Sequence, residues 1–176
     1  IVSHVVHLLK TAMEARATEQ ITPEEIEHSD DDPLCVLALD WANAFNRMGR
    51  ASIHAALEAY CPHLLPFFRW AYRDGSPLCL SDVTPVCSSE TGVRQGDPLG
   101  PLFFDIALHP FLLSLQTKYP KLLLALAFHD DTTLAGPRSL LVRIVNELHA
   151  FFREDNPNNT MGMVLNLAKT QLWDPS

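Results

Sequence analysis

The chain has 176 residues and 47% of them are hydrophobic, which is enough for one domain with a real core and excludes disorder as the default. Its 21 acidic and 13 basic residues give a net charge of −8, which argues against tight nucleic-acid binding by the chain alone. The four cysteines show no CxxC spacing, and no apolar run approaches the roughly 20 residues of a bilayer span, so we expect no zinc site, no disulfide framework and no membrane.

The first 33 residues divide into a predicted helix and an acidic loop. Apolar residues recur at close to helical spacing between Val2 and Met13. Residues 19–32 hold seven acidic residues and no Lys or Arg, and without them the balance is 14 acidic against 13 basic. Reduced cysteines and the absence of a signal sequence lead us to expect an intracellular protein, in the nucleus or cytoplasm and not secreted.

The segments up to residue 92 alternate between strand and helix patterns. Residues 34–40 are short and apolar after Pro33, as in a fully buried strand, and residues 50–60 and 64–74 show helical patterns. Residues 76–82 and 83–92 suggest two strands joined by a turn, with Pro85 favouring a sheet edge for the second.

The second half begins with a helix start at Asp97 and Pro98, an acceptor followed by a preset φ. This helix is predicted to run to Leu115 and could bend at Pro110. The remaining segments are listed by residue range: strands at 122–128 and 132–136 forming a hairpin, a helix over 139–153, a turn at 156–162, and a strand or extended segment at 163–173. The pattern predicts an α+β fold, with helices packed on one face of an antiparallel sheet.

Three aspartates follow the most apolar of these strands. Asp40 ends the strand over 34–40, and Asp130 and Asp131 end the strand over 122–128. Adjacent like charges repel and lose solvation on burial, so the pair is either an exposed, solvated turn or a cation site. If the two strands are neighbours, three carboxylates meet at one sheet edge, an oxygen-rich site that suits Mg²⁺. Two such ions about 3.5 to 4 Å apart can promote phosphoryl transfer.

Four sequence blocks occur in a fixed order: LALDWANAFNRM, TGVRQGDPLGPLFFDIALHP, AFHDDTTLAG and MGMVLNLAKTQLW. From Leu34 to Trp173 the chain resembles the reverse transcriptase family, most of all the enzymes of non-LTR (LINE-type) retrotransposons. The resemblance implies a right-hand polymerase palm and RNA-directed DNA polymerase activity, with nucleotidyl transfer to a primer 3′-hydroxyl. It also implies two Mg²⁺ ions, with Mn²⁺ as an alternative, and an RNA template, a DNA primer and deoxynucleoside triphosphates as partners.

The resemblance assigns nucleotide and metal roles around the first block. Asp40 matches a ligand of both metals, and the backbone carbonyl of Trp41 matches a further metal contact. Phe45 matches the bulky residue beneath the sugar of the incoming nucleotide, which excludes a ribose 2′-hydroxyl because a filled pocket has no room for it. Core packing is the alternative explanation for Phe45.

The other blocks complete the predicted site. Gln95 and Gly96 match a pair beside the incoming nucleotide and the template. Asp130 matches an aspartate that shares the metals with Asp40, and Asp131 matches its less directly acting neighbour. Lys169 matches the lysine that protonates or neutralises the pyrophosphate leaving group, with a plain surface lysine as the alternative.

The chain also departs from the complete family. Phe128 stands where the family has tyrosine, and His129 occupies a variable position to which we assign no role. We expect residues 1–176 to be a partial reverse transcriptase domain, the palm with part of the fingers. We expect the N-terminal fingers strands and the C-terminal thumb to lie outside these residues in a longer parent protein, and therefore expect the piece alone to bind primer and template weakly. The alternative is a catalytically inactive retroelement remnant that acts as a structural or interaction module.

Overall fold

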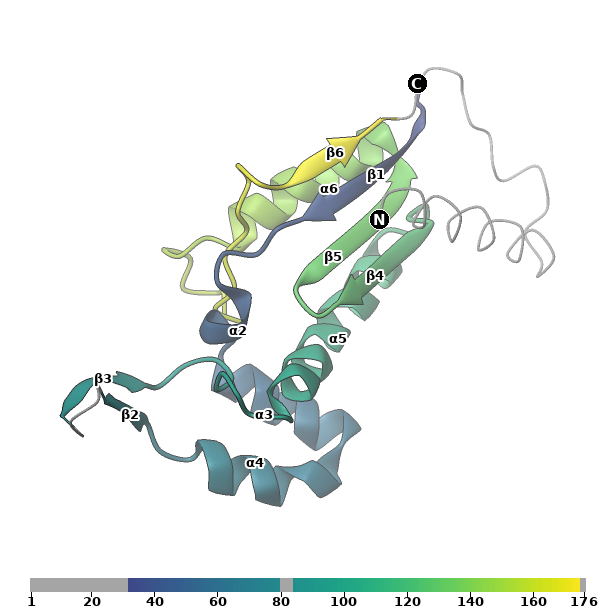
Figure 1. The fold of residues 1–176 in the computed structure, drawn as a ribbon. Helices are drawn as coiled ribbons and strands as arrows, with labels where there is room; N and C mark the ends of the chain where they lie inside the picture. Colours follow the sequence, from purple (N-terminus) through teal and green to yellow (C-terminus); the bar gives the residue numbers. More distant parts are fainter. Residues whose placement is uncertain (1–31, 80–83, 175–176) are drawn as a thin grey trace.

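The structure is a computed structural model that describes residues 32–79 and 84–174 (Figure 1). The predicted helix over 2–13 and nearly all of the acidic loop lie outside these residues. A four-stranded antiparallel sheet has helices on one face, which confirms the predicted α+β class. Its strands in spatial order are β4 (Leu124–Phe128), β5 (Asp131–Pro137), β1 (Leu34–Leu39) and β6 (Gln171–Trp173).

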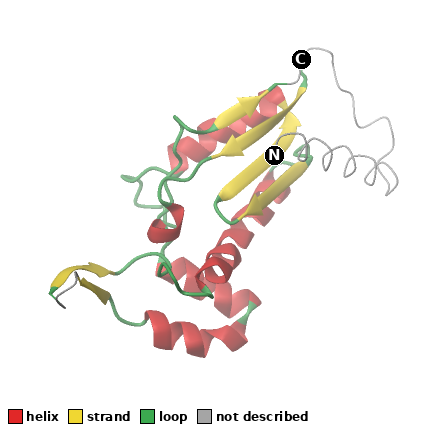
Figure 2. Ribbon diagram, in the orientation of Figure 1, coloured by secondary structure: helices red, strands yellow, loops and turns green. Residues whose placement is uncertain are grey.

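The remaining elements surround this sheet or extend away from it (Figure 2). In chain order they are α2 (Ala44–Arg47), α3 (Arg50–Tyr60), the 3-10 helix η2 (Pro62–Leu64), α4 (Leu65–Tyr72), β2 (Ser76–Cys79), β3 (Pro85–Ser89), α5 (Gly100–Lys118) and α6 (Arg138–Phe151). Strands β2 and β3 form a separate two-stranded antiparallel sheet, and Pro85 begins β3, a position that suits its missing N–H. No helix of the described segments is both long and apolar enough to cross a bilayer.

The core lies between the central strands and the helix layer. Strand β1 alternates towards it through Cys35, Leu37 and Leu39, as its apolar sequence predicts, and Leu134 of β5 faces the same way with no exposed surface. The fully buried helix residues of the same core are Phe103, Phe104 and Leu108 of α5, Leu141 and Ile144 of α6, and Ile53 and Leu57 of α3, which packs against α5. Among the described residues, helices cover this face of the sheet and none packs on the other face (Figure 1).

The main differences from the sequence prediction lie at α5, in the C-terminal segment and at α2. Helix α5 begins at Gly100, three residues after the predicted cap, and Asp97 lies in the preceding turn, where one carboxylate oxygen accepts from the Leu99 amide and the other from the Tyr72 hydroxyl. The helix then continues through Pro110 to Lys118. The extended segment predicted over 163–173 is mostly irregular and contributes only β6 and an isolated bridge, and the four-residue helix α2 was not predicted.

Candidate active site

The predicted carboxylates lie at the adjacent ends of β1 and β5. The two strands pair in antiparallel register up to Leu39 opposite Thr132, so Asp40 comes opposite Asp131 one step further on. Asp130 lies in the two-residue turn that joins β4 to β5. Leu39 and Thr132 point into the core, and successive side chains of a strand point to opposite faces. Asp40 and Asp131 are therefore directed to the face of the sheet that is not packed against the helices. The strands over 34–40 and 122–128 are not neighbours, contrary to the sequence prediction, because β5 lies between them, and it is Asp131 rather than Asp130 that comes across from Asp40.

A buried hydrogen bond holds these strand ends together. The indole Nε1 of Trp41 donates to Oγ1 of Thr132 over 3.1 Å, and the two residues are only 4% and 1% exposed. The indole ring also meets Phe111 and Phe152 edge to face, with centroids 5.8 and 5.0 Å away. Each partner directly follows one of the predicted catalytic aspartates, so the bond fixes the positions of Asp40 and Asp131 relative to each other.

The turn that carries Lys169 is attached to Asp40 through the backbone. The amide of Asn166 donates to the Asp40 carbonyl over 2.8 Å, and the Asp40 amide donates to the Thr170 hydroxyl over 3.3 Å. Lys169 lies between these two contacts and is exposed. The structure therefore brings the fourth sequence block beside the first, although 126 residues separate Asp40 from Asn166 in sequence.

The loop before α5 is bound to α2, the helix that carries Phe45. The Gly92 amide donates to the Met48 carbonyl and the Val93 amide to the Phe45 carbonyl, over 2.9 and 2.8 Å. Gly92 has φ of 65°, and a Cβ there would lie 2.3 Å from the Phe45 carbonyl oxygen. Only glycine allows this approach. The sequence analysis did not select Gly92, although its place in the block GVRQG was a usable signal.

Gln95 and Gly96 occupy an exposed turn just beyond this junction. The turn is closed by the Asp97 amide donating to the Arg94 carbonyl over 3.2 Å. Gly96 is its third residue and has φ of 89°, the position where a type II turn requires a positive φ. Nothing lies within 4 Å of a Cβ built on Gly96. The backbone there is open to an approaching molecule.

Tyr72 anchors the same turn from α4. Its hydroxyl accepts from the Arg94 amide and donates to the Asp97 carboxylate. Burial raises the pKa of Tyr72 to about 12, and the hydrogen bond to Asp97 acts in the same direction, so the hydroxyl remains a donor at neutral pH. The guanidinium of Arg94 lies over the tyrosine ring, 5.1 Å from its centroid. The turn therefore has a rigid support behind it.

Phe45 lies half-buried at the end of α2 that faces α5. Its ring stacks on the fully buried ring of Phe104 with centroids 4.6 Å apart. The His129 ring meets it more edge-on at 5.9 Å, and His129 Nδ1 is 3.0 Å from both carboxylate oxygens of Asp105. Sequence reasoning gave His129 no role and missed Asp105, although Asp105 is the one carboxylate within α5.

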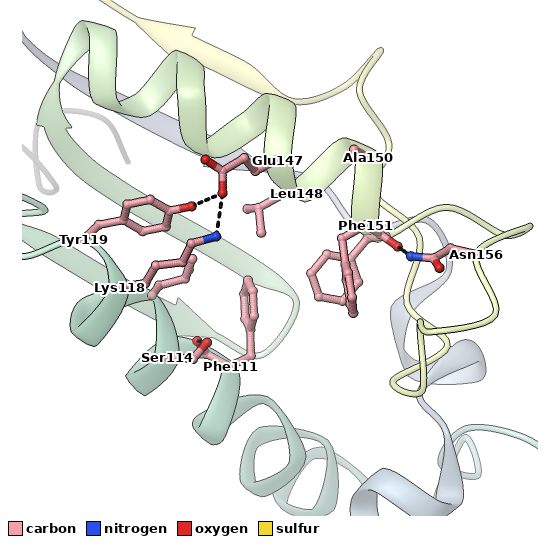
Figure 3. A pocket seen from close by; sticks show the side chains of 11 residues that line it. Phe111, Ser114, Lys118, Tyr119, Glu147, Leu148, Ala150, Phe151 and Asn156 are labelled. Carbon is pink, nitrogen blue, oxygen red and sulfur yellow. Dashed lines mark hydrogen bonds and ion pairs between the residues drawn. The ribbon is translucent and has the colours of Figure 1, made fainter.

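A separate groove of about 630 Å³ lies between α5 and α6 (Figure 3). The groove is lined mostly by apolar side chains and has a polar cluster on one side. There the Glu147 carboxylate accepts hydrogen bonds from the Lys118 ammonium and the Tyr119 hydroxyl. These hydrogen bonds, that from Lys118 first, lower the pKa of Glu147 to about 2. None of the predicted site residues lines this groove, so it belongs to the helix layer and not to the carboxylate edge.

The carboxylate edge has the donor chemistry for a divalent metal. Asp40, Asp130 and Asp131 offer hard oxygen ligands, which Mg²⁺ prefers. Within residues 32–79 and 84–174, no group of three or more His, Cys, Asp or Glu side chains is already gathered closely enough to hold a metal ion. The residues fit the ion by type, and the side chains would have to converge on it.

A sheet backed by helices, with carboxylates at the ends of neighbouring central strands, defines the palm of a nucleic-acid polymerase. The sequence model of the family "Reverse transcriptase (RNA-dependent DNA polymerase)" matches residues 3–176, and the chain belongs to this family. No curated protein matches the sequence.

Solved telomerase structures share the fold. Telomerase from Candida albicans in complex with a TWJ fragment of telomeric RNA superposes with a TM-score of 0.63 at 14% identity, covering 100% of this chain and 31% of that chain. Apo telomerase from Candida tropicalis gives 0.60 at 11% identity, covering 99% of this chain and 37% of that chain. The present chain therefore spans about a third of the telomerase chains that it matches.

Proposed function

We propose that the chain is the palm of an RNA-directed DNA polymerase from a non-LTR (LINE-type) retrotransposon. Membership of the reverse transcriptase family supports the reaction class. The observation that carries the proposal is the register of β1 and β5, which sets Asp40 opposite Asp131 with Asp130 in the adjoining turn. We further propose that the chain is a partial domain, acting with fingers strands and a thumb of a longer parent protein in the nucleus or cytoplasm.

The proposed reaction joins a deoxynucleoside triphosphate to a DNA primer on an RNA template. The primer 3′-oxygen forms a bond to the α-phosphorus as the bond to pyrophosphate breaks. Asp40, Asp130, Asp131 and the Trp41 carbonyl would hold two Mg²⁺ ions, or Mn²⁺ in their place. Bound there, the ions would supply charge stabilisation of the transferred phosphoryl group.

The chain's other residues bind and orient the substrates in this proposal. Phe45 fills the space that a ribose 2′-hydroxyl would need, which restricts the enzyme to deoxynucleotides. Gln95 and Gly96 face the nucleotide and template, and the open space at Gly96 supports that role. Lys169 delivers a proton or a positive charge to the departing pyrophosphate, and the hydrogen bonds of its neighbours Asn166 and Thr170 to the Asp40 backbone support a position near the reaction.

Primer extension by the full-length parent protein tests the proposal. We expect Asp40→Asn and Asp130→Asn each to reduce RNA-templated extension by about a thousandfold or more, because each removes a charge used in the transition state. Asp155→Asn is the matched control, since Asp155 is exposed and paired with Arg153 away from the sheet edge. Equal activity of Asp40→Asn and the control would contradict the proposal.

A catalytically inactive remnant is the second candidate. The observation in its favour is that the described residues hold no preformed group of three metal-ligating side chains. This candidate predicts that the unsubstituted parent protein yields no Mg²⁺-dependent product. It also predicts that Asp40→Asn does not change how the parent protein binds its interaction partners. The same assay therefore separates the two candidates.

A further inference from the structure

Two neighbouring residues of α5 support the ring of Phe45, one by direct contact and one through a third side chain. Phe104 stacks directly against the ring face, with an interplanar angle of 23°. Asp105 binds His129, whose ring lies against Phe45 at 64°. Phe45 itself belongs to a helix of four residues, which is too short to hold a side chain rigidly by itself. The position of its ring therefore depends on what packs around it.

The backbone of His129 is held in an unusual conformation that directs its ring to this place. His129 has φ of 57° in the turn between β4 and β5, a region that few non-glycine residues adopt. Its ring also contacts that of Phe128, with centroids 4.5 Å apart. Because Nδ1 faces a carboxylate, that nitrogen carries the proton and donates it. Asp105 thereby fixes both the orientation and the tautomer of the ring.

The contact between Asp105 and His129 is not needed to form the hairpin. Backbone pairing of β4 with β5 already sets the turn, up to Phe128 opposite Asp131. Both polar side chains are partly exposed, at 41% and 33%, so water could satisfy them if they were apart. What the pair adds is a fixed imidazole at the edge of Phe45.

We infer that Asp105 is a positioning residue that acts through His129 to hold Phe45 in place, and that the pair helps to set the discrimination between deoxyribonucleotides and ribonucleotides. The inference rests on the proposed function, in which Phe45 excludes the 2′-hydroxyl. Steric exclusion works only if the excluding ring does not yield. Phe104 stacks on one face of the ring and blocks movement towards that side. His129 lies at the edge of the contact and blocks movement in its own direction.

The test measures kcat/KM for a deoxynucleotide and for its ribonucleotide in primer extension by the full-length parent. We expect Asp105→Ala and His129→Asn each to lower the ratio of the two values about tenfold, the lower end of what one pocket contact contributes to selectivity. Asparagine tolerates the left-handed backbone at position 129, so that variant removes the ring without adding backbone strain. We expect Asp105→Asn, which keeps an acceptor for Nδ1, to retain the ratio.

A double variant and a control variant show whether Asp105 and His129 act through one shared support. The double variant Asp105→Ala/His129→Asn should be no worse than either single variant, because both remove one shared support. His109→Ala is the control: this histidine lies four residues further along α5 and contacts Tyr60 instead. Thermal melting of every variant identifies any that fail to fold, and Asp105→Asn remains informative in that case.

Each outcome decides the matter. An unchanged ratio in the single variants, an equal loss for both nucleotides, or additive losses in the double variant would each overturn the inference while leaving the polymerase in place. Absence of extension by the unsubstituted parent would instead overturn the proposed function and the inference with it.

Discussion

The edge that carries Asp40 and the hairpin of β2 and β3 are both built from antiparallel strands, and they differ in what lies behind them. Behind the edge are the buried Trp41–Thr132 hydrogen bond and the core. The hairpin stands away from the main sheet (Figure 2), and its Leu78 and Val86 are 51% and 62% exposed. The hairpin register also shifts beside Leu78, whereas β1 and β5 pair without a break. Burial of one face is what makes a register strict.

The largest expected effect contrasts two glycines near the edge. Gly92→Ala should lower the free energy of unfolding by about 2–5 kcal/mol, because it adds a positive-φ penalty to a clash with the Phe45 carbonyl. Gly96→Ala should cost only about 1–2 kcal/mol, since its surroundings are open. Urea denaturation measures both, and equal losses would show that close packing at Gly92 contributes nothing.

The buried hydrogen bond should come next in size. Thr132→Val keeps the side-chain shape but leaves the Trp41 indole N–H without its partner, at a cost of about 1–3 kcal/mol in the free energy of unfolding. Thr133→Val, on the other face of β5, is the matched control and should change little. If the two variants unfolded at the same urea concentration, the bond would not be what distinguishes this edge.

The polar cluster of Glu147, Lys118 and Tyr119 tests whether partly exposed side chains can also stabilise the fold. The side chains of Lys118 and Glu147 are 60% and 39% exposed, yet hydrogen bonds from Lys118 and Tyr119 lower the pKa of Glu147 from 4.5 to about 2. A lowered carboxyl pKa stabilises the fold above the unfolded value, and this stability is lost as pH falls from about 4.5 through 2. Glu147→Gln should therefore melt lower than the parent at pH 7, with the difference closing below pH 4.5. A difference in melting temperature that stayed constant down to pH 2.5 would contradict the assignment.

The smallest effect is expected in the hairpin. Val86→Ala should change the free energy of unfolding by no more than about 0.5 kcal/mol, as exposed substitutions generally do. Val93→Ala, at a position only 4% exposed, should cost about 2 kcal/mol through lost burial and the cavity that it leaves. Chemical denaturation of the two variants compares an exposed with a buried valine by the same substitution. Similar losses in the free energy of unfolding would show that burial does not distinguish the two positions.

Local patterns were sufficient to predict most of the elements. The apolar run after Pro33 became β1, the helical periodicity of residues 50–60 became α3 with the same bounds, and the strands predicted at 122–128 and 132–136 became the β4–β5 hairpin. These predictions succeed because periodicity and breaker residues act within a few positions of the chain. The predicted start of α5 was wrong: the helix begins at Gly100, and Asp97 belongs to the turn before it, where its carboxylate also binds Tyr72, 25 residues earlier in the sequence.

Chain order and spacing alone established which residues carry charge at the ends of apolar strands, and the block GVRQGDPLGPLFF marked the family. Folding determined which carboxylate stands across from Asp40, that Trp41 donates a hydrogen bond to Thr132, and that Asp105 meets the otherwise unassigned His129. Such pairings join residues 24 to 91 positions apart, and no local propensity encodes them. They follow from strand order and helix packing, because a contact between distant residues forms only when the whole core has been assembled.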